Sequence, residues 1–164
     1  MARSRADAEV AYRALHAPWE AALSLFRFAG AWAPPIERVA RGWGAWDGNT
    51  LCGALLAERA GKSAMLHGPV VVIPPDAPAE LAFDIADHLV SALLTEGDQI
   101  DTVFTRPQGL DRIWVRSGFI PVPEAELPAA LRDCPGLGLY GWRGGTALWS
   151  AAGRGPRARP SAIR

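Results

Sequence analysis

The sequence predicts one α/β domain, built on a mixed, mainly antiparallel twisted sheet that is flanked by helices. Three observations predict it: three strand-like segments separated by tight-turn residues, an apolar β-branched stretch that leads into a long amphipathic segment, and an alternation of strand and helix patterns after that segment. The chain of 164 residues is 49% hydrophobic and 21% charged, which suits a domain with a buried core and not a disordered chain. We assign residues 1–150 to this domain and residues 151–164 to a basic tail rich in Gly, Pro and Arg.

Composition excludes several classes of protein. No apolar run reaches the roughly 18 residues that a membrane span needs, and no signal-peptide pattern opens the chain, so we expect a cytoplasmic protein without membrane contact. Two cysteines, Cys52 and Cys134, are too few to staple a secreted scaffold of this length. The tail carries four arginines and no acid, which leaves the body mildly acidic, so nucleic-acid binding is not expected.

The first half of the chain predicts helices and then a meander. Apolar side chains at three- and four-residue spacing predict a helix over residues 4–28, which Pro18 should kink. A second, short helix is predicted from Pro35 to Arg41. Three antiparallel strands are predicted to follow, with turns at Asp47-Gly48-Asn49 and Ala60-Gly61-Lys62, over residues 43–46, 51–59 and 63–73.

The second half predicts strands that alternate with helices. The run Val70 to Ile73 is apolar at every position, which is typical of an inner strand that is covered on both faces. A helix is predicted from an Asp76 N-cap to Thr95, with Gly97 as its stop. A proline-interrupted loop is expected over residues 123–136, and the remaining predicted elements are a strand at 100–105, a helix at 110–117 and strands at 119–122, 137–142 and 146–149.

Two segments within this order carry a family resemblance. Leu66-His67-Gly68-Pro69-Val70-Val71-Val72 precedes the long helix, and Ile113-Trp114-Val115-Arg116-Ser117-Gly118-Phe119 follows the next strand. With these segments, residues 43–142 resemble the Gcn5-related N-acetyltransferase (GNAT) superfamily. The resemblance implies transfer of an acyl group from acetyl-CoA or a related acyl-CoA to the amine of a small molecule or a protein. The opening strand of such a fold has no evident counterpart, because residues 4–28 are predicted to be helical.

The loop after the valine-rich strand departs from the pattern that the family uses to hold the pyrophosphate of acetyl-CoA. The family pattern is rich in glycine, whereas residues 74–80 contain no glycine, three prolines without an N–H group, and the acids Asp76 and Glu80. Binding of the coenzyme is therefore expected to rest on the strand backbone instead of a phosphate loop, and a backbone N–H group of that strand could polarise a thioester carbonyl. The candidate cofactor-binding residues are Val70, Val71, Val72, Ala77, Ala79 and Arg106.

Two side chains are candidates for the catalytic base that takes a proton from the amine. Glu58 and His67 lie on neighbouring strands of the predicted meander, near the place where the resemblance puts the acceptor groove. Each also has a structural interpretation, His67 as a hydrogen-bonded strand residue and Glu58 as a solvent-facing one. Trp114 stands where family members usually have a Tyr that protonates the leaving thiolate, and an indole N–H cannot do this near neutral pH. The candidate groove residues are Trp43, Trp46 and Trp114.

Two functions therefore stay open. The first is a divergent N-acyltransferase, and the alternative is a catalytically degenerate GNAT-fold binding or interaction module without acetyltransferase activity. The alternative is compatible with a homodimer that forms through the C-terminal strands, where Trp142 and Trp149 could anchor a partner. No metal site is predicted, because the histidines and cysteines show no short ligand spacing.

Overall fold

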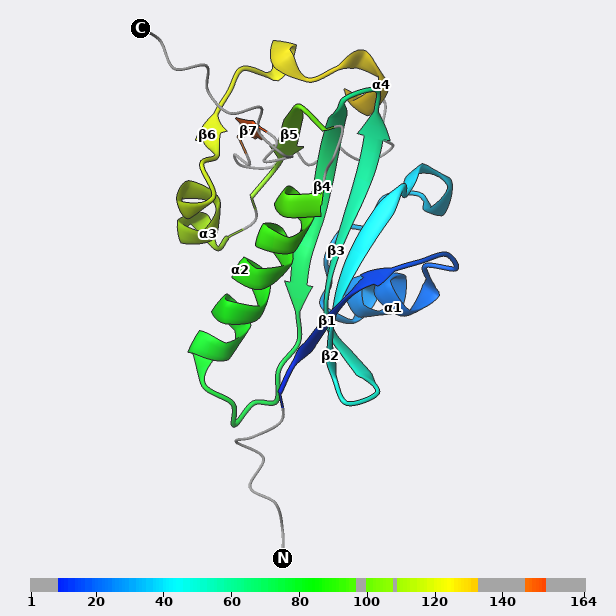
Figure 1. The fold of residues 1–164 in the computed structure, drawn as a ribbon, viewed down its shortest axis with the longest axis vertical. Helices are drawn as coiled ribbons and strands as arrows, with labels where there is room; N and C mark the ends of the chain where they lie inside the picture. Colours follow the sequence, from blue (N-terminus) through cyan, green and yellow to red (C-terminus); the bar gives the residue numbers. More distant parts are fainter. Residues whose placement is uncertain (1–8, 97–99, 108, 133–146, 153–164) are drawn as a thin grey trace, which may run out of the picture.

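A computed structural model describes residues 9–96, 100–107, 109–132 and 147–152. It shows a seven-stranded sheet in the order β1-β2-β3-β4-β5-β7-β6, with helices packed on it (Figure 1), which confirms the predicted fold class. The strands are β1 Ala11–Leu15, β2 Arg41–Asp47, β3 Thr50–Ala60, β4 Ser63–Val71, β5 Thr102–Thr105, β6 Ile120–Pro121 and β7 Trp149–Ala152. The helices are α1 Glu20–Phe28, α2 Ala79–Glu96, α3 Asp111–Arg116 and α4 Ala129–Arg132, with the 3-10 turns η2 Ile36–Arg38 and η3 Glu124–Glu126.

The N-terminal prediction was wrong in its first half, because residues 11–15 form the opening strand of the sheet. This strand, β1, pairs antiparallel with β2, and α1 begins only after Pro18. Val10 and Tyr12 pack on one side of the sheet and Leu15 on the other. Alanines between these residues fit a helix as well as a strand, so pairing with β2 decides the conformation.

The predicted meander is confirmed, and two of its strands extend beyond their predicted bounds. β2, β3 and β4 pair antiparallel in sequence order. The helix predicted from Pro35 to Arg41 is only the 3-10 turn η2, because Arg41 already belongs to β2 and pairs with Ala57. β4 lies inside the sheet between β3 and β5, but it ends at Val71 and not at Ile73 as predicted, and only its first half, up to Leu66, pairs with β5.

Alternation along the strands places two apolar cores on opposite faces of the sheet. Leu55 belongs to the core that α2 and α3 cover, whereas Leu56 belongs to the core that α1 covers. Successive side chains of a strand point to opposite faces, so these neighbours separate the two layers of helices. Val70 packs on the α1 side and Val71 on the α2 side, which confirms that both faces of this strand are covered.

The segment after β6 was expected to be a loop but contains η3 and α4. Pro123 and Pro128 each start a turn, since their carbonyl groups accept hydrogen bonds from the N–H groups of Glu126 and Leu131. Proline favours the first turn of a helix because its fixed φ angle suits that position. The prolines therefore begin local structure here instead of breaking it.

The C-terminal strand β7 lies between β5 and β6. Trp149 lies on this strand and packs against the α2-side core. β7 continues to Ala152, two residues past the boundary that we set at residue 150. Gly97, Trp142, the strand predicted at 137–142 and the tail from residue 153 lie outside the described residues. Within the described part of the chain, no helix is long and apolar enough to cross a membrane.

Candidate functional site

The candidate site lies where β4 and β5 stop pairing. The two strands are parallel neighbours from the Ser63–Thr102 pair to the Leu66–Thr105 pair. β5 ends at Thr105, but β4 continues to Val71. Within the described ranges, the last five residues of β4 therefore have no strand beside them on the β5 side.

A bulge shapes β4 at the beginning of this unpaired stretch. Leu56 pairs with His67 and Ala54 with Val70, so two residues, Gly68 and Pro69, face a single residue of β3. Gly68 has φ +96°, and a Cβ atom there would lie 3.0 Å from the carbonyl oxygen of Ala54. The bulge therefore requires glycine, and it turns the following backbone relative to the paired half of β4.

A cavity of about 390 Å³ fills this gap and is bounded from both faces of the sheet. The segment from Phe26 to Trp32 closes it on the α1 side, and Ala82 of α2 and Trp114 of α3 close it on the other side. Leu66 to Val71 of β4 form its floor.

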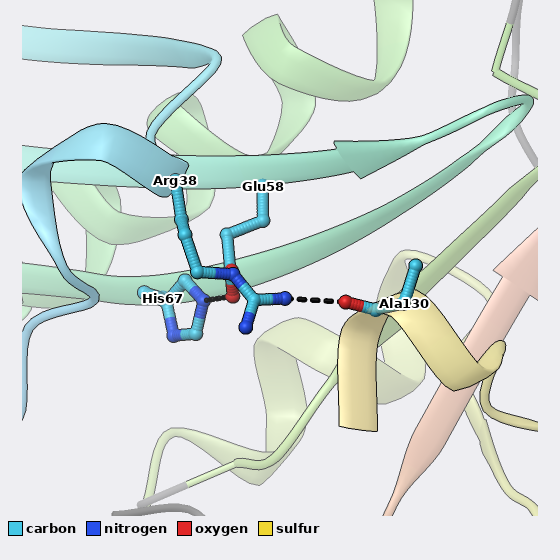
Figure 2. A network of polar contacts seen from close by, with 4 residues as sticks. All are labelled: Arg38, Glu58, His67 and Ala130. Carbon is cyan, nitrogen blue, oxygen red and sulfur yellow. Dashed lines mark hydrogen bonds and ion pairs between the residues drawn. The ribbon is translucent and has the colours of Figure 1, made fainter. Parts of the chain in front are cut away.

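Glu58 and His67 form a buried hydrogen-bonded pair at this cavity (Figure 2). Nε2 of His67 lies 2.7 Å from Oε2 of Glu58, and the two side chains are 5% and 2% exposed. Arg38 of η2 pairs with the other carboxylate oxygen at 2.5 Å and also donates a hydrogen bond to the carbonyl of Ala130 in α4. Glu58 is thus not solvent-facing, which corrects that interpretation, and the structure brings the two predicted base candidates together.

The polar cluster of Arg38, Glu58 and His67 lies between two apolar clusters on the α1 face of the sheet. Leu56, two residues before Glu58, packs under α1, and Met65, two residues before His67, packs under α4 with Leu127 and Leu131. Strand alternation therefore points both polar side chains to the same face. The ring of Trp32 lies 5.0 Å from the ring of His67 and walls the cavity beside it.

Two more predicted residues line the cavity from the α3 side. Trp114 is 1% exposed and packs edge-to-face on Phe119 at 5.0 Å. Arg106 follows β5 and forms a two-pronged ion pair with Glu124 of η3, in which Nη2 donates at 2.7 Å. The hydrogen bond from Arg106 lowers the pKa of Glu124 from its ordinary value. Nε of Arg106 is buried and has no hydrogen-bond partner among the described residues.

Trp43 and Trp46 do not line this cavity. Both lie on β2, and β3 separates that strand from β4. Trp43 packs against the α2-side core, and Trp46 lies under the guanidinium of Arg13 at 4.9 Å.

The loop that the resemblance assigns to a pyrophosphate, residues 74–78, has few free backbone donors. The N–H of Ala77 bonds the carbonyl of Pro74, and the N–H of Leu81 bonds the carbonyl of Pro78. The helix begins at Ala79 and not at an Asp76 N-cap, because Asp76 lies inside the first of these turns. Val72, Ala77 and Ala79 lie outside the cavity lining, whereas Val70 and Val71 belong to it. The residues present therefore fit an acyl chain in the gap but not a diphosphate at this loop.

Arg38 and Trp32 were not among the residues predicted for the site. Both lie in the segment between α1 and β2, and nothing in the local pattern distinguishes them from ordinary surface and core residues. Only the packing of this segment on β3 and β4 brings them to Glu58 and His67. Among the described residues no group of three metal-ligating side chains occurs.

Comparison with known proteins gives structural relatives only. No protein-family model and no curated protein sequence matches the chain. The fold is similar to that of N-acetylglutamate synthase from Neisseria gonorrhoeae, solved with coenzyme A and N-acetyl-glutamate, with a TM-score of 0.63 and 13% identity over 90% of this chain. The match spans only 36% of that longer protein.

Two further matches span most or all of the known protein. The ribosomal-protein-S18-alanine N-acetyltransferase of Escherichia coli gives a TM-score of 0.60 at 11% identity, over 94% of this chain and 100% of that one. A Desulfovibrio desulfuricans protein assigned to the GNAT family gives a TM-score of 0.53 at 14% identity, over 70% of this chain and 87% of that one. With its seven-stranded mixed sheet and flanking helices, this chain has the fold of the Gcn5-related N-acetyltransferases.

Proposed function

We propose that this protein is a divergent N-acyltransferase, which moves an acetyl or related acyl group from an acyl-CoA-type thioester to an amine. One observation carries the proposal: the buried Glu58–His67 pair lies at a cavity that is lined from both faces of the sheet, beside the part of β4 that extends past β5. The donor would enter from the α2 side and the amine from the α1 side. The structural relatives are named as enzymes that acetylate amines, which supports the same class of reaction.

His67 is the proposed base. An ionised carboxylate can only accept hydrogen bonds, and Arg38 supplies the opposite charge to Glu58. Nε2–H of His67 therefore donates to Glu58, which leaves the lone pair on Nδ1. Nδ1 makes no hydrogen bond to the described residues, so it is available to hold the proton that an attacking amine loses.

Val71 supplies the proposed donor to the thioester carbonyl. The N–H of Val72 bonds the carbonyl of Cys52 on β3, and successive N–H groups of a strand point to opposite edges. The N–H of Val71 therefore points into the gap beside β5. Pro69, which lies in the bulge two residues before Val71, has no N–H group. Hydrogen bonding to the carbonyl oxygen stabilises the negative charge that develops there during attack.

The bound thioester would supply an activated acyl group. The amine nitrogen forms a bond to the carbonyl carbon, the carbon–sulfur bond breaks, the amine proton goes to Nδ1 of His67 and the sulfur leaves as a thiolate. Trp114 cannot protonate that thiolate, so the proton must come from solvent. The acceptor is an amine of a small molecule or of a protein, and the cavity wall from Phe26 to Trp32 is the surface that it would meet.

The test is release of free thiol from acetyl-CoA in the presence of a panel of amines, namely amino acids, polyamines and peptides with free N-termini. His67→Gln should lower the amine-dependent rate by about 10²–10⁴-fold, the usual contribution of a general base. Its Kd for the thioester should stay within about twofold of the wild type, since His67 faces the amine side. His88→Gln is the matched control, because His88 is exposed on α2 and stacks on Tyr12 outside the cavity.

A binding module without transferase activity is the second candidate, and Trp114 in place of a proton donor favours it. Such a module would bind the thioester without turnover. Ligand at 100 times its Kd should then raise the free energy of unfolding by about 2.7 kcal/mol, with no thiol release for any amine. Amine-dependent thiol release that His67→Gln abolishes would exclude this candidate.

A further inference from the structure

We infer that the donor is recognised through its pantetheine arm alone and that the nucleotide diphosphate contributes nothing to binding. This inference rests on the proposed function and specifies its substrate. It predicts that a pantetheine thioester binds as tightly as the full coenzyme thioester.

The backbone around the start of α2 offers little to a diphosphate. Among residues 74–81, three are prolines without an N–H group, and the N–H groups of Ala77 and Leu81 are already bonded to carbonyls. Diphosphate sites at helix N-termini depend on several free N–H groups that converge on the ligand. This loop offers at most the N–H groups of Asp76, Ala79 and Glu80, and two of these three belong to acidic residues.

The charges around the loop are also unfavourable to a diphosphate. Asp76 and Glu80 are both exposed beside the helix start, where a phosphate would lie. Residues 63–105, which include β4, α2 and β5, contain no Lys or Arg. A polyanion at this point would meet two carboxylates and no neutralising side chain from its own strand–helix unit.

Two arginines of α3 approach the same helix from the side. Arg112 lies over the ring of Phe83 at 4.6 Å, and Arg116 pairs with Asp87 at 3.9 Å. Both guanidiniums therefore already contact α2 beyond its first turn. Arg112 lies nearer the Phe83 ring than Arg116, at 4.6 Å against 6.0 Å, so we choose Arg112 for a test of whether α3 holds a diphosphate.

The cavity, in contrast, offers what a pantetheine arm needs. That arm is a thin chain with two amide groups and apolar methylene and methyl groups. The unpartnered Nε of Arg106 could donate to one of its carbonyls, and Leu66 and Ala82 supply apolar wall. The cavity volume of about 390 Å³ lies near the lower end of the range for small-molecule pockets, about 300–1,000 Å³, which suits an arm better than a whole nucleotide coenzyme.

The experiment compares the Kd of acetyl-CoA with the Kd of S-acetylpantetheine by isothermal titration calorimetry on the full chain. We expect the two values to agree within about threefold, equivalent to less than the 1.4 kcal/mol of a tenfold difference. Tighter binding of acetyl-CoA by about tenfold or more would overturn this inference and leave the proposed function standing. Failure of both thioesters to bind would overturn the inference and the proposed function together.

Exposed variants sharpen the comparison. Asp76→Asn/Glu80→Gln should leave the Kd of acetyl-CoA and the Kd of S-acetylpantetheine within about threefold of the wild type, because a diphosphate that makes no contact at the helix start gains nothing from removal of the two charges. Asp84→Asn, one turn further along α2, is the matched control and should change neither Kd. Arg112→Gln should also change neither, and selective loss of acetyl-CoA binding in that variant would show that Arg112 holds the diphosphate.

Discussion

His67 and Glu58 lie diagonally across β4 and β3, with Nε2 of His67 2.7 Å from Oε2 of Glu58 and both side chains buried. The pair lies at the boundary of two apolar clusters, so water cannot replace either partner at low cost. Arg38 of η2 forms an ion pair with Glu58. This contact links the segment after α1 to the middle of the sheet. Stability and catalysis should therefore depend on the same three residues.

Removing Arg38 should destabilise the fold. Arg38→Met leaves the buried carboxylate of Glu58 without its positive partner, and we expect the free energy of unfolding to fall by about 1–3 kcal/mol. We do not expect the larger loss of stability that follows when a fully buried ion pair is broken, because the Arg38 side chain is 24% exposed. Urea denaturation measures the effect. Arg41→Met, on the exposed first residue of β2, is the control and should change stability by no more than about 0.5 kcal/mol.

Gly68→Ala should be costly because both the φ angle of +96° and the space at the bulge require glycine. We expect a loss of about 1–3 kcal/mol in the free energy of unfolding, the usual cost of such backbone strain. Gly48→Ala is the control, since Gly48 also has a positive φ of +59° but no atom lies within 4 Å of the point that its Cβ would occupy. Equal losses of unfolding free energy in the two variants would show that the close contact with the Ala54 carbonyl does not contribute to the cost of Gly68→Ala.

Trp114→Tyr should raise the rate of acyl transfer if protonation of the leaving thiolate limits it. A phenol can donate the proton that an indole cannot, and the gain could approach the roughly 10²-fold lower range for general acids. Trp114→Phe fills nearly the same space as the Tyr variant without the hydroxyl and is the control for lost packing. A Tyr variant no faster than the Phe variant would place the limiting step elsewhere.

The Arg106–Glu124 pair should make stability weakly dependent on pH in acid. The pKa of Glu124 is lowered in the fold, mainly by the hydrogen bond from Arg106, so the pair stabilises the protein above the ordinary Glu pKa of 4.5. This stability is lost as pH falls through the lowered pKa. Glu124 is 63% exposed, which limits the contribution to at most about 1 kcal/mol.

Thermal unfolding of the wild type and of Glu124→Gln between pH 7 and pH 3 checks this prediction. The stability difference between the two proteins should be present near neutral pH and shrink below about pH 4.5. Glu126→Gln, on the same exposed turn, is the matched control for the loss of one negative charge. A difference that grows in acid would contradict the assigned sign.

Local patterns predicted the meander, the long helix α2 and the apolar inner strand, because tight turns and apolar periodicity are encoded within a few residues. They did not predict β1, where alanines between Val10 and Leu15 suit a helix equally well. They also missed the short helices after Pro123 and Pro128. These helices begin with backbone hydrogen bonds to the carbonyl groups of the two prolines. In each case the secondary structure depended on strand pairing or turn geometry, which the periodicity of apolar residues does not reveal.

The order of residues was enough to establish that Glu58 and His67 lie on adjacent strands and that the loop before α2 has no glycine and two acids. Three-dimensional packing was needed to show that the two side chains share one face, that Arg38 and Trp32 join them, and that β4 outruns β5 to open a cavity beside them. Strand register and the packing of distant segments are set by the whole core at once. A single stretch of chain therefore cannot show which side chains will meet.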